Sequence, residues 1–215
     1  NQTSIFIKGK QVLNSNNINV PSDLSSSAFF IIAALINRGS KINLNNININ
    51  PSRDGILKAL KKMGAKISIE NKRTVSGEVV ADLEVEYSDL VGCELDAEMA
   101  KFMIDEYPIL SIAAAFAKGT SIFKGLKELK VKESDRLELI RLNLVNCGCD
   151  CEVINDDLII RPSENYFPIN NKIRTDFDHR IAMSFAVMGS KVDNLMIEDG
   201  ESINTSFPNF VEKFN

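Results

Sequence analysis

One layout occurs three times along this chain, and it constrains the fold more than any other feature. Each copy opens with an aspartate, continues through an apolar, alanine-containing run and reaches a glycine that a short β-type stretch follows. The copies are residues 21–44 with Asp23 and Gly39, residues 104–126 with Asp105 and Gly119, and residues 177–197 with Asp178 and Gly189. Aspartate before such a run is typical of a helix N-cap, and glycine after it of a C-cap. Because the runs are apolar nearly all round, we expect three helices that are buried on every side.

A second kind of helix follows the first two β-type stretches. Residues 52–69 carry an apolar stripe beside lysines, and residues 133–154 have a similar layout. Each of these predicted amphipathic helices ends at a glycine, Gly64 or Gly148, and runs into a strand. After the second, a turn at residues 155–157 predicts a returning strand.

The third copy stops early. Residues 206–214 predict its second helix, but no closing strands follow. The strand-like residues 4–13 are one candidate donor of a closing strand. A repeat of about 75 residues is too long for a small solenoid. The pattern therefore predicts an α+β fold of α/β repeats, in which three βαβαββ-type units pack around the buried helices of residues 21–215.

The charge balance and the apolar runs exclude some classes of function. The chain has 25 Lys and Arg against 29 Asp and Glu, a net charge of -4 and no basic block, so we expect no nucleic-acid partner. An anionic small molecule needs only local positive charge and is not excluded. The longest apolar stretch, residues 28–36, is far shorter than the roughly 20 residues of a membrane span. The first residues do not resemble a secretory signal, and we expect a cytoplasmic protein with no membrane partner.

The four cysteines favour a structural role over a metal or redox site. Cys147, Cys149 and Cys151 alternate, so a strand there would place them on one face, where cysteine behaves as a small apolar residue. No further cysteine and histidine pair has the spacing of a zinc site. Free thiols are compatible with a reducing compartment.

Charged residues at the third predicted buried helix suggest an anion site. Its start reads Asp178-His179-Arg180, and His179 is the one histidine of the chain. Cationic groups at the positive end of a helix are electrostatically unfavourable unless an anion binds there. A salt bridge between Arg180 and a nearby acid is the simpler alternative.

A second charged cluster precedes the second amphipathic helix. Lys130, Lys132, Glu133 and Arg136 surround the helix start, which Ser134 or Asp135 caps. Such a run is usually a solvated charged face. The alternative is an anion-binding cluster in which Glu133 is a general acid or base.

The acids at residues 105 and 106 open an otherwise apolar helix. Capping by Asp105, with Pro108 in the first turn, is a sufficient structural role. If the second and third copies are neighbours, however, Asp105, Glu133 and Arg180 face a common cleft. Two carboxylates beside several cations suit proton transfer on a polyanionic substrate.

Several motifs together resemble one enzyme family. They are VPSDLSSSAFFIIAALI, MIDEYPILSIAAAFAKGT, KVKESDRL, DHRIAMSF and TSFPNF, and they extend over nearly the whole chain. In combination they resemble the C-terminal half of the 5-enolpyruvylshikimate-3-phosphate synthases, and DEYPILSIAAAFA with KVKESDRL is most similar to the subgroup that includes glyphosate-insensitive bacterial enzymes. The resemblance implies one domain of a two-domain fold, with residues 1–20 as an N-terminal strand and interdomain hinge region and residues 21–215 as the C-terminal-half domain.

The resemblance also implies a reaction and its partners. Members transfer the enolpyruvyl group of phosphoenolpyruvate to the 5-hydroxyl of shikimate 3-phosphate and release phosphate, with no cofactor or metal. The active site lies between the two domains, so the implied partners are both substrates and the N-terminal domain of the same enzyme.

Residue by residue, the resemblance implies the following roles. Asp105 is a general base beside the accepting hydroxyl, and Glu133 exchanges the proton of the enol methylene, although the sequence does not decide which carboxylate serves which step. Lys132 contacts shikimate 3-phosphate, while Arg136 and Arg180 bind phosphoenolpyruvate, because arginine suits bidentate binding of carboxylate or phosphate. His179 orients and lines the site.

Two departures from the family pattern bear on function. Thr205 occupies a position where many members have a phosphate-binding lysine. The family's N-terminal half, which supplies further substrate ligands, is absent from this sequence, so we expect weak binding and little or no turnover from the chain alone. The alternatives are a UDP-N-acetylglucosamine enolpyruvyl transferase, a non-catalytic anion-binding module and, least favoured, a purely structural repeat protein.

Overall fold

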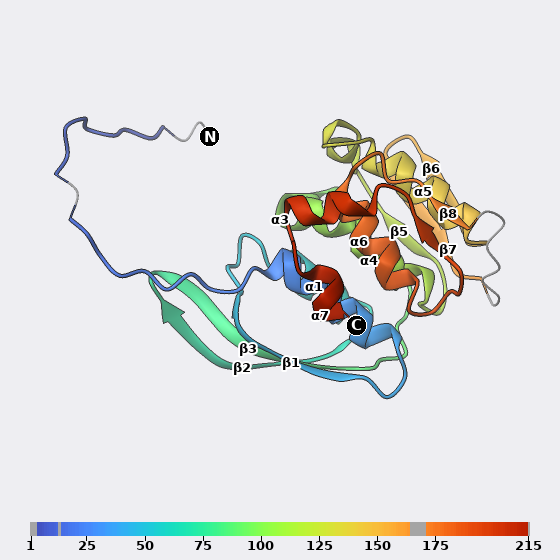
Figure 1. The fold of residues 1–215 in the computed structure, drawn as a ribbon, viewed down its shortest axis with the longest axis horizontal. Coiled ribbons are helices and arrows are strands. Elements are labelled where there is room, and N and C mark those ends of the chain that lie inside the picture. The colour runs from blue at the N-terminus through green and yellow to red at the C-terminus, as the bar shows by residue number, and fades with distance from the viewer. Residues whose placement is uncertain (1–3, 13, 164–170, 215) are drawn as a thin grey trace.

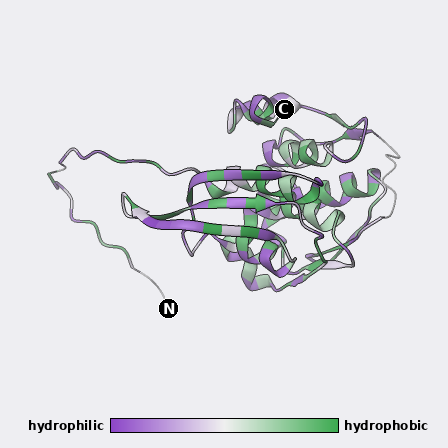
Figure 2. Cartoon of the chain, turned by 90° about the horizontal axis from the view of Figure 1, so that it is seen from below, coloured by the Kyte–Doolittle hydropathy of each residue, from purple (hydrophilic) through white to green (hydrophobic). Residues whose placement is uncertain are grey.

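The structure is a computed structural model that describes residues 4–12, 14–163 and 171–214. Its centre consists of three helices that pack against one another. They are α1 (Leu24–Ile36), α4 (Tyr107–Ala115) and α6 (His179–Met188). Their side chains form much of the apolar core, so the prediction of three buried helices is confirmed. Figure 2 shows largely hydrophobic helices behind a sheet with mixed hydropathy.

The first unit, residues 22–86, is a sheet with an amphipathic helix beside it. Ser22 forms an isolated parallel bridge to Ile47, and the strands that follow have the order β1-β3-β2, all antiparallel. The elements are β1 (Lys41–Asn48), α2 (Gly55–Lys62), β2 (Lys66–Val75) and β3 (Glu78–Glu86). Figure 1 shows the β2–β3 hairpin extending beyond the helices. Its turn is Ser76-Gly77, and both residues have positive φ, as a two-residue hairpin requires.

The second unit, residues 94–161, repeats this topology. Its strand order is β4-β5-β7-β6, with β4 parallel to β5, so Ser22 and β1 of the first unit correspond to β4 and β5. The strands are β4 (Glu94–Leu95), β5 (Ser121–Phe123), β6 (Asp150–Ile154) and β7 (Asp157–Arg161). The helices are α3 (Ala100–Met103), α4 and α5 (Arg136–Asn146), with 3₁₀ turns at Ala97–Met99, Ile104–Glu106 and Lys127–Val131. The predicted hairpin turn after β6 is confirmed, with Asn155 at positive φ.

The third unit is the shortest in the described part of the chain. Around α6 it has β8 (Lys172–Ile173), which pairs in parallel with β9 (Met196–Ile197), a 3₁₀ turn at Gly200–Thr205 and α7 (Phe210–Phe214). Phe207, Phe210 and Phe214 pack on Phe30 of α1 and attach this end of the chain to the core. The closing hairpin of the other two units has no counterpart among residues 171–214, as the sequence predicted.

The N-terminal strand expected within residues 1–20 is not formed among the described residues and stays a prediction. Residues 4–12 and 14–20 contain no strand, and Figure 1 shows them leading away from the helices. Phe6 is 92% exposed and Ile7 is 87% exposed. A strand requires a neighbouring backbone to accept its hydrogen bonds, and the hydrogen bond that this stretch makes is from Asn19 N to Ser76 Oγ (3.0 Å).

Two of the three predicted aspartate caps are formed. Asp23 accepts a hydrogen bond from Ser26 N (2.8 Å), and Asp178 accepts one from Arg180 N (2.9 Å). Asp105 is the exception, because α4 begins two residues later and the Asp105 side chain makes no cap hydrogen bond. Its carboxylate is therefore free to contact other groups.

The cysteines are buried and free, as the structural interpretation requires. Burial raises the pKa of Cys147 to about 12 and that of Cys149 to about 12. Because β6 begins at Asp150, only Cys151 lies in the strand, and Cys147 caps α5. Among the described residues, no group of three or more His, Cys, Asp or Glu is arranged to hold a metal ion. In the same residues, we find no helix with the length and apolar character needed to span a bilayer.

Candidate functional site

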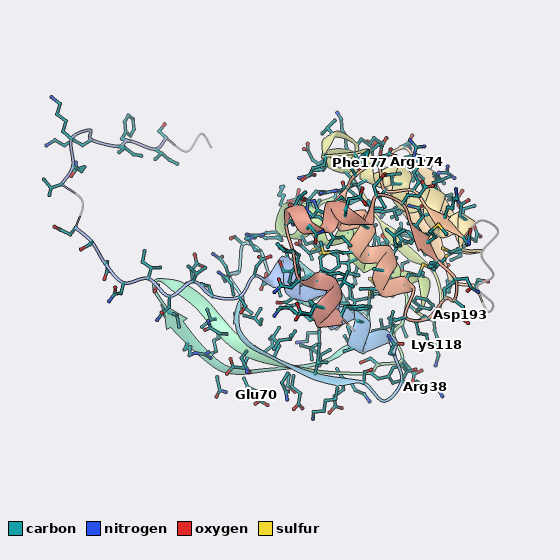
Figure 3. All side chains as sticks on the ribbon, in the orientation of Figure 1. Arg38, Glu70, Lys118, Arg174, Phe177 and Asp193 are labelled. Carbon is teal, nitrogen blue, oxygen red and sulfur yellow. The ribbon has the colours of Figure 1, made fainter. Side chains whose placement is uncertain are left out.

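A cluster of charged side chains joins the N-terminal ends of α4, α5 and α6. Phe177, labelled in Figure 3, directly precedes Asp178, the N-cap of α6, and marks this end of the molecule. The α5 helix starts here because Asp135 caps it, with its carboxylate accepting from Glu138 N (3.0 Å). Of the two cap candidates in the sequence, Asp135 is therefore the cap, and Ser134 donates instead to Asp178 (2.9 Å).

Arg136 is the centre of the cluster. Its side chain is 1% exposed and contacts one carboxylate from each of three segments. Nε donates to Oδ2 of Asp178 (2.8 Å), Nη1 donates to Oδ1 of Asp105 (3.0 Å), and Nη2 lies 2.6 Å from Oε2 of Glu133. A buried guanidinium is tolerated only when paired in this way, so Arg136 fixes the three helix starts relative to one another.

Asp105 is half-buried between cations. Besides Arg136, its Oδ1 contacts Nζ of Lys132 at 3.2 Å. Burial alone would raise the pKa of Asp105, but Arg180, Lys132 and Arg136 outweigh it and hold that pKa below its ordinary value. The carboxylate is therefore ionised at neutral pH and available to accept a proton.

Arg180 differs from Arg136 in how many of its donors are used. Nη1 donates to the backbone oxygen of Asp105 (3.2 Å) and lies 3.8 Å from Oε1 of Glu106. A guanidinium has five donors, and most of those of Arg180 make no hydrogen bond to the described residues. Arg180 is therefore the arginine of the cluster with capacity left for an anion.

His179 occupies the first position of α6 and is half-buried. Burial lowers its pKa, and the charges of Arg180 and Arg136 lower it further against the opposing effect of Asp178 and Glu133. The imidazole is therefore neutral at pH 7, and the unfavourable charge that the sequence suggested at this helix end comes from Arg180 alone.

The structure brings most of the predicted site residues together. Asp105, Lys132, Glu133, Arg136 and Arg180 share contacts, and His179 adjoins them in sequence. Lys130 is the exception in its cluster, because Nζ contacts Oδ1 of Asp156 (2.7 Å) in the β6–β7 turn. Thr205 donates its hydroxyl to the backbone oxygen of Ser202 (2.7 Å).

Two residues of the cluster were not predicted as part of it. Asp178 was expected only as a cap, but it also binds Arg136 while fully buried. Glu106 is 5% exposed beside Arg180. The signal for Glu106 was its spacing: it precedes Leu110 and Ala113 by four and seven residues, which places it on the same buried helix face.

The fold is one that an enolpyruvyl transferase also has. The NikO enolpyruvyl transferase of Streptomyces tendae superimposes with a TM-score of 0.62 over 90% of this chain and 42% of that one, and its 15% identity shows the fold alone. A closer relationship follows from the sequence: residues 1–214 match the profile of EPSP synthase (3-phosphoshikimate 1-carboxyvinyltransferase), and the chain belongs to that family.

Individual relatives agree with this assignment. The 3-phosphoshikimate 1-carboxyvinyltransferase of Paramagnetospirillum magneticum is 46% identical over 99% of this chain and 48% of that protein. The protein of that name from Rhizobium johnstonii is 44% identical over 97% and 47%. The EPSP synthase structure from Acinetobacter baumannii superimposes with a TM-score of 0.88 at 40% identity, over 94% of this chain and 47% of that one. The chain thus spans about half the length of the curated relatives it matches.

Proposed function

We propose that this chain is the C-terminal half of an enzyme that transfers the enolpyruvyl group of phosphoenolpyruvate to the 5-hydroxyl of shikimate 3-phosphate. The observation that carries the proposal is the cluster around Arg136, in which two partly exposed carboxylates, Asp105 and Glu133, lie among three cations. The names of the relatives support the same reaction. By the same proposal, the phosphates and carboxylates of both substrates are bound by cations at this end of the molecule.

The chemistry requires two proton transfers around one bond formation. The 5-hydroxyl oxygen attacks C2 of phosphoenolpyruvate and loses its proton to one carboxylate, while C3 receives a proton from the other. The tetrahedral intermediate then loses phosphate from C2 and a proton from C3, which restores the vinyl group. Asp105 is proposed as the base for the hydroxyl because it is ionised and lies beside Lys132, the proposed ligand of shikimate 3-phosphate.

The remaining roles follow from exposure and free donors. Glu133 is proposed to exchange the C3 proton, because its side chain is the more exposed of the two carboxylates. Arg180 is proposed to bind phosphoenolpyruvate through its unused donors, with Arg136 beside it and the neutral His179 lining the site. The ionic groups are positioned before substrate binds, which reduces the reorganisation that catalysis requires.

The chain is proposed to act together with the N-terminal half of the same enzyme. That half would close the cleft and supply the remaining substrate ligands, so the chain alone should bind substrates weakly and turn over little. No nucleic-acid or membrane partner is proposed, and a cytoplasmic location stays a prediction from the sequence.

The test is phosphate release from phosphoenolpyruvate and shikimate 3-phosphate by this chain mixed with the N-terminal half from its own gene. We expect turnover only from the mixture, and a loss of at least about 100-fold with Asp105→Asn, because a positioned general base contributes about 10²–10⁴-fold. No turnover from a folded mixture would reject the proposal, after which UDP-N-acetylglucosamine would be tested as acceptor. Anion binding without turnover on either acceptor would leave a binding module.

A further inference from the structure

Glu106 is a buried carboxylate for which the proposed reaction has no role. It lies in the 3₁₀ turn that leads into α4 and is 5% exposed. Its Oε1 is buried and has no hydrogen-bond partner among the described residues. A buried oxygen without a partner is costly, so its presence here calls for an explanation.

The surroundings of Glu106 come from all three buried helices. The Ser25 hydroxyl near the start of α1 lowers the pKa of Glu106 against the larger, opposing effect of burial, and it accepts a hydrogen bond from Nη2 of Arg53 (3.1 Å). On the other side, Nη1 of Arg180 at the start of α6 lies 3.8 Å from Oε1. Arg53, Ser25, Glu106 and Arg180 therefore form a continuous series from the first unit to the third.

The electrostatic effect of Glu106 on an anion is unfavourable. A negative charge beside Arg180 opposes any phosphate or carboxylate that binds there. A carboxylate in this position therefore does not serve by attracting the ligand. It can serve by fixing the cation that does, since a movement of Arg180 by ~1 Å would bring Nη1 within hydrogen-bond distance of Oε1.

We propose that Glu106 is a positioning residue that holds the Arg180 guanidinium in its anion-binding orientation and couples it, through Ser25 and Arg53, to the first unit. Arg136 is held by three carboxylates, whereas Arg180 has Glu106 as its one side-chain acceptor within ion-pair distance among the described residues. The consequence for substrate binding rests on the proposed function, but the positioning of Arg180 does not.

The test uses the full chain with isotope-labelled arginine, and it observes the side-chain Nε–H signals by NMR. Arg180 is assigned with Arg180→Lys. We expect Glu106→Gln to shift and broaden the Arg180 signal and to leave the signals of Arg141 and Arg161 unchanged, because these pair with other carboxylates. The matched control is Glu70→Gln on the exposed β2 strand, labelled in Figure 3, which removes the same charge.

The second readout is kinetic and uses the mixture with the N-terminal half. We expect Glu106→Gln to raise KM for phosphoenolpyruvate by about tenfold or more and to change kcat less, because the ionic contact that orients Arg180 for binding is lost. If Glu106 acted only through its negative charge, Glu106→Gln would instead lower KM for phosphoenolpyruvate.

The outcomes separate the two claims. An unchanged Arg180 signal in Glu106→Gln, or a lower KM, overturns the inference. A wild-type mixture without turnover, in which the Arg180 signal still depends on Glu106, overturns the proposed function and leaves the positioning intact. If Glu106→Gln does not fold, Ser25→Ala is used instead, because Ser25 is the neighbour of Glu106 in the same series of side chains. We expect Ser25→Ala to shift the Arg180 signal in the same direction by a smaller amount.

Discussion

The first and second units have the same topology but carry their polar clusters on different elements. In the first unit, α2 begins after Asp54, which makes no cap hydrogen bond and pairs with Lys58 one turn along (2.6 Å). Arg53 beside it is exposed. At the corresponding start of α5, Arg136 is buried among three carboxylates.

The polar cluster of the first unit lies in its sheet instead. Asp82 of β3 accepts hydrogen bonds from Asn46 N (2.8 Å), Asn71 Nδ2 (3.0 Å) and Arg73 Nη2 (3.2 Å). Asn46 and Asn71 have positive φ at the register shifts of β1 and β2, so this cluster fixes paired irregularities on both sides of β3.

The difference shows that the same residue types, on the same topology, can either stabilise a sheet or form a candidate functional site. The Asp82 cluster is built within one sheet from residues of one unit. The Arg136 cluster joins helix starts from two units, next to Arg180, most of whose donors make no hydrogen bond to the described residues. Contacts between units, rather than composition, distinguish the candidate site.

The largest expected effect is the loss of Arg136. Arg136→Met leaves Asp178 buried without its cation, and we expect the free energy of unfolding to fall by about 3–5 kcal/mol. Arg53→Met, one residue before the cap position of α2 in the first unit, should cost less than about 1 kcal/mol, because Arg53 is exposed. Urea unfolding followed by circular dichroism measures both, and equal losses would contradict the comparison.

Substitutions of the two aspartate caps Asp23 and Asp178 should also differ in their effect on stability. Asparagine caps a helix about as well as aspartate, so Asp23→Asn should change stability little. Asp178→Asn keeps a cap but loses the ionic bond to Arg136, and we expect a loss of about 2–3 kcal/mol. Thermal and urea unfolding of the two variants should be compared at pH 7, and a similar small loss in both would show that capping alone matters at Asp178.

Asp82 of the first unit and Glu106 beside Arg180 should contribute to the pH dependence of stability with opposite signs. Hydrogen bonds from Asn46, Asn71 and Arg73 lower the pKa of Asp82 from 3.8 to about 2, so its stabilising contribution is complete above about pH 4 and is lost as the pH falls toward 2. Burial raises the pKa of Glu106 above 4.5, so its contribution weakens as the pH rises above that value.

The measurement is urea unfolding across pH 2–8. Asp82→Asn should remove part of the acid loss, and Glu106→Gln should remove part of the decrease above pH 4.5. Profiles parallel to that of the wild type in both variants would contradict the assignment of these two groups.

The smallest expected effects concern the two hairpin turns. Gly77 has a φ of 86° and open space around its Cα, so Gly77→Ala adds backbone strain without a clash and should cost about 1 kcal/mol. Asn155 has a φ of 59°, which asparagine tolerates, and Asn155→Gly should change stability by less than about 0.5 kcal/mol. A loss in Asn155→Gly as large as that in Gly77→Ala would mean that the shorter hairpin depends on its turn more than the geometry indicates.

The sequence predicted what local patterns determine. The three buried helices, the amphipathic pair and the hairpin after β6 follow from apolar periodicity and from glycine and aspartate at element ends. The common location of Asp105, Glu133 and Arg180 also followed, because repeated units place equivalent helix starts at one end.

What the sequence missed depends on contacts between distant residues. Asp23, Asp105 and Asp178 occupy the same place in the repeat, yet Asp105 turns away from α4 because Arg136, 31 residues later, binds it. The burial of Arg136 and the placement of Glu106 between Ser25 and Arg180 depend on how the helices pack. The lack of strand pairing at residues 4–12 has a similar cause, since strand propensity does not reveal whether the edge of a sheet is within reach.

The exposed residues 4–12 have a practical consequence. Ile5, Phe6 and Ile7 present a short extended run to water, with backbone groups that have no ladder partner in the described chain. Such a run is a template for pairing with a second copy of itself, and the tendency grows with protein concentration. For the isolated chain, we therefore expect association between copies to limit the usable protein concentration at temperatures below thermal unfolding.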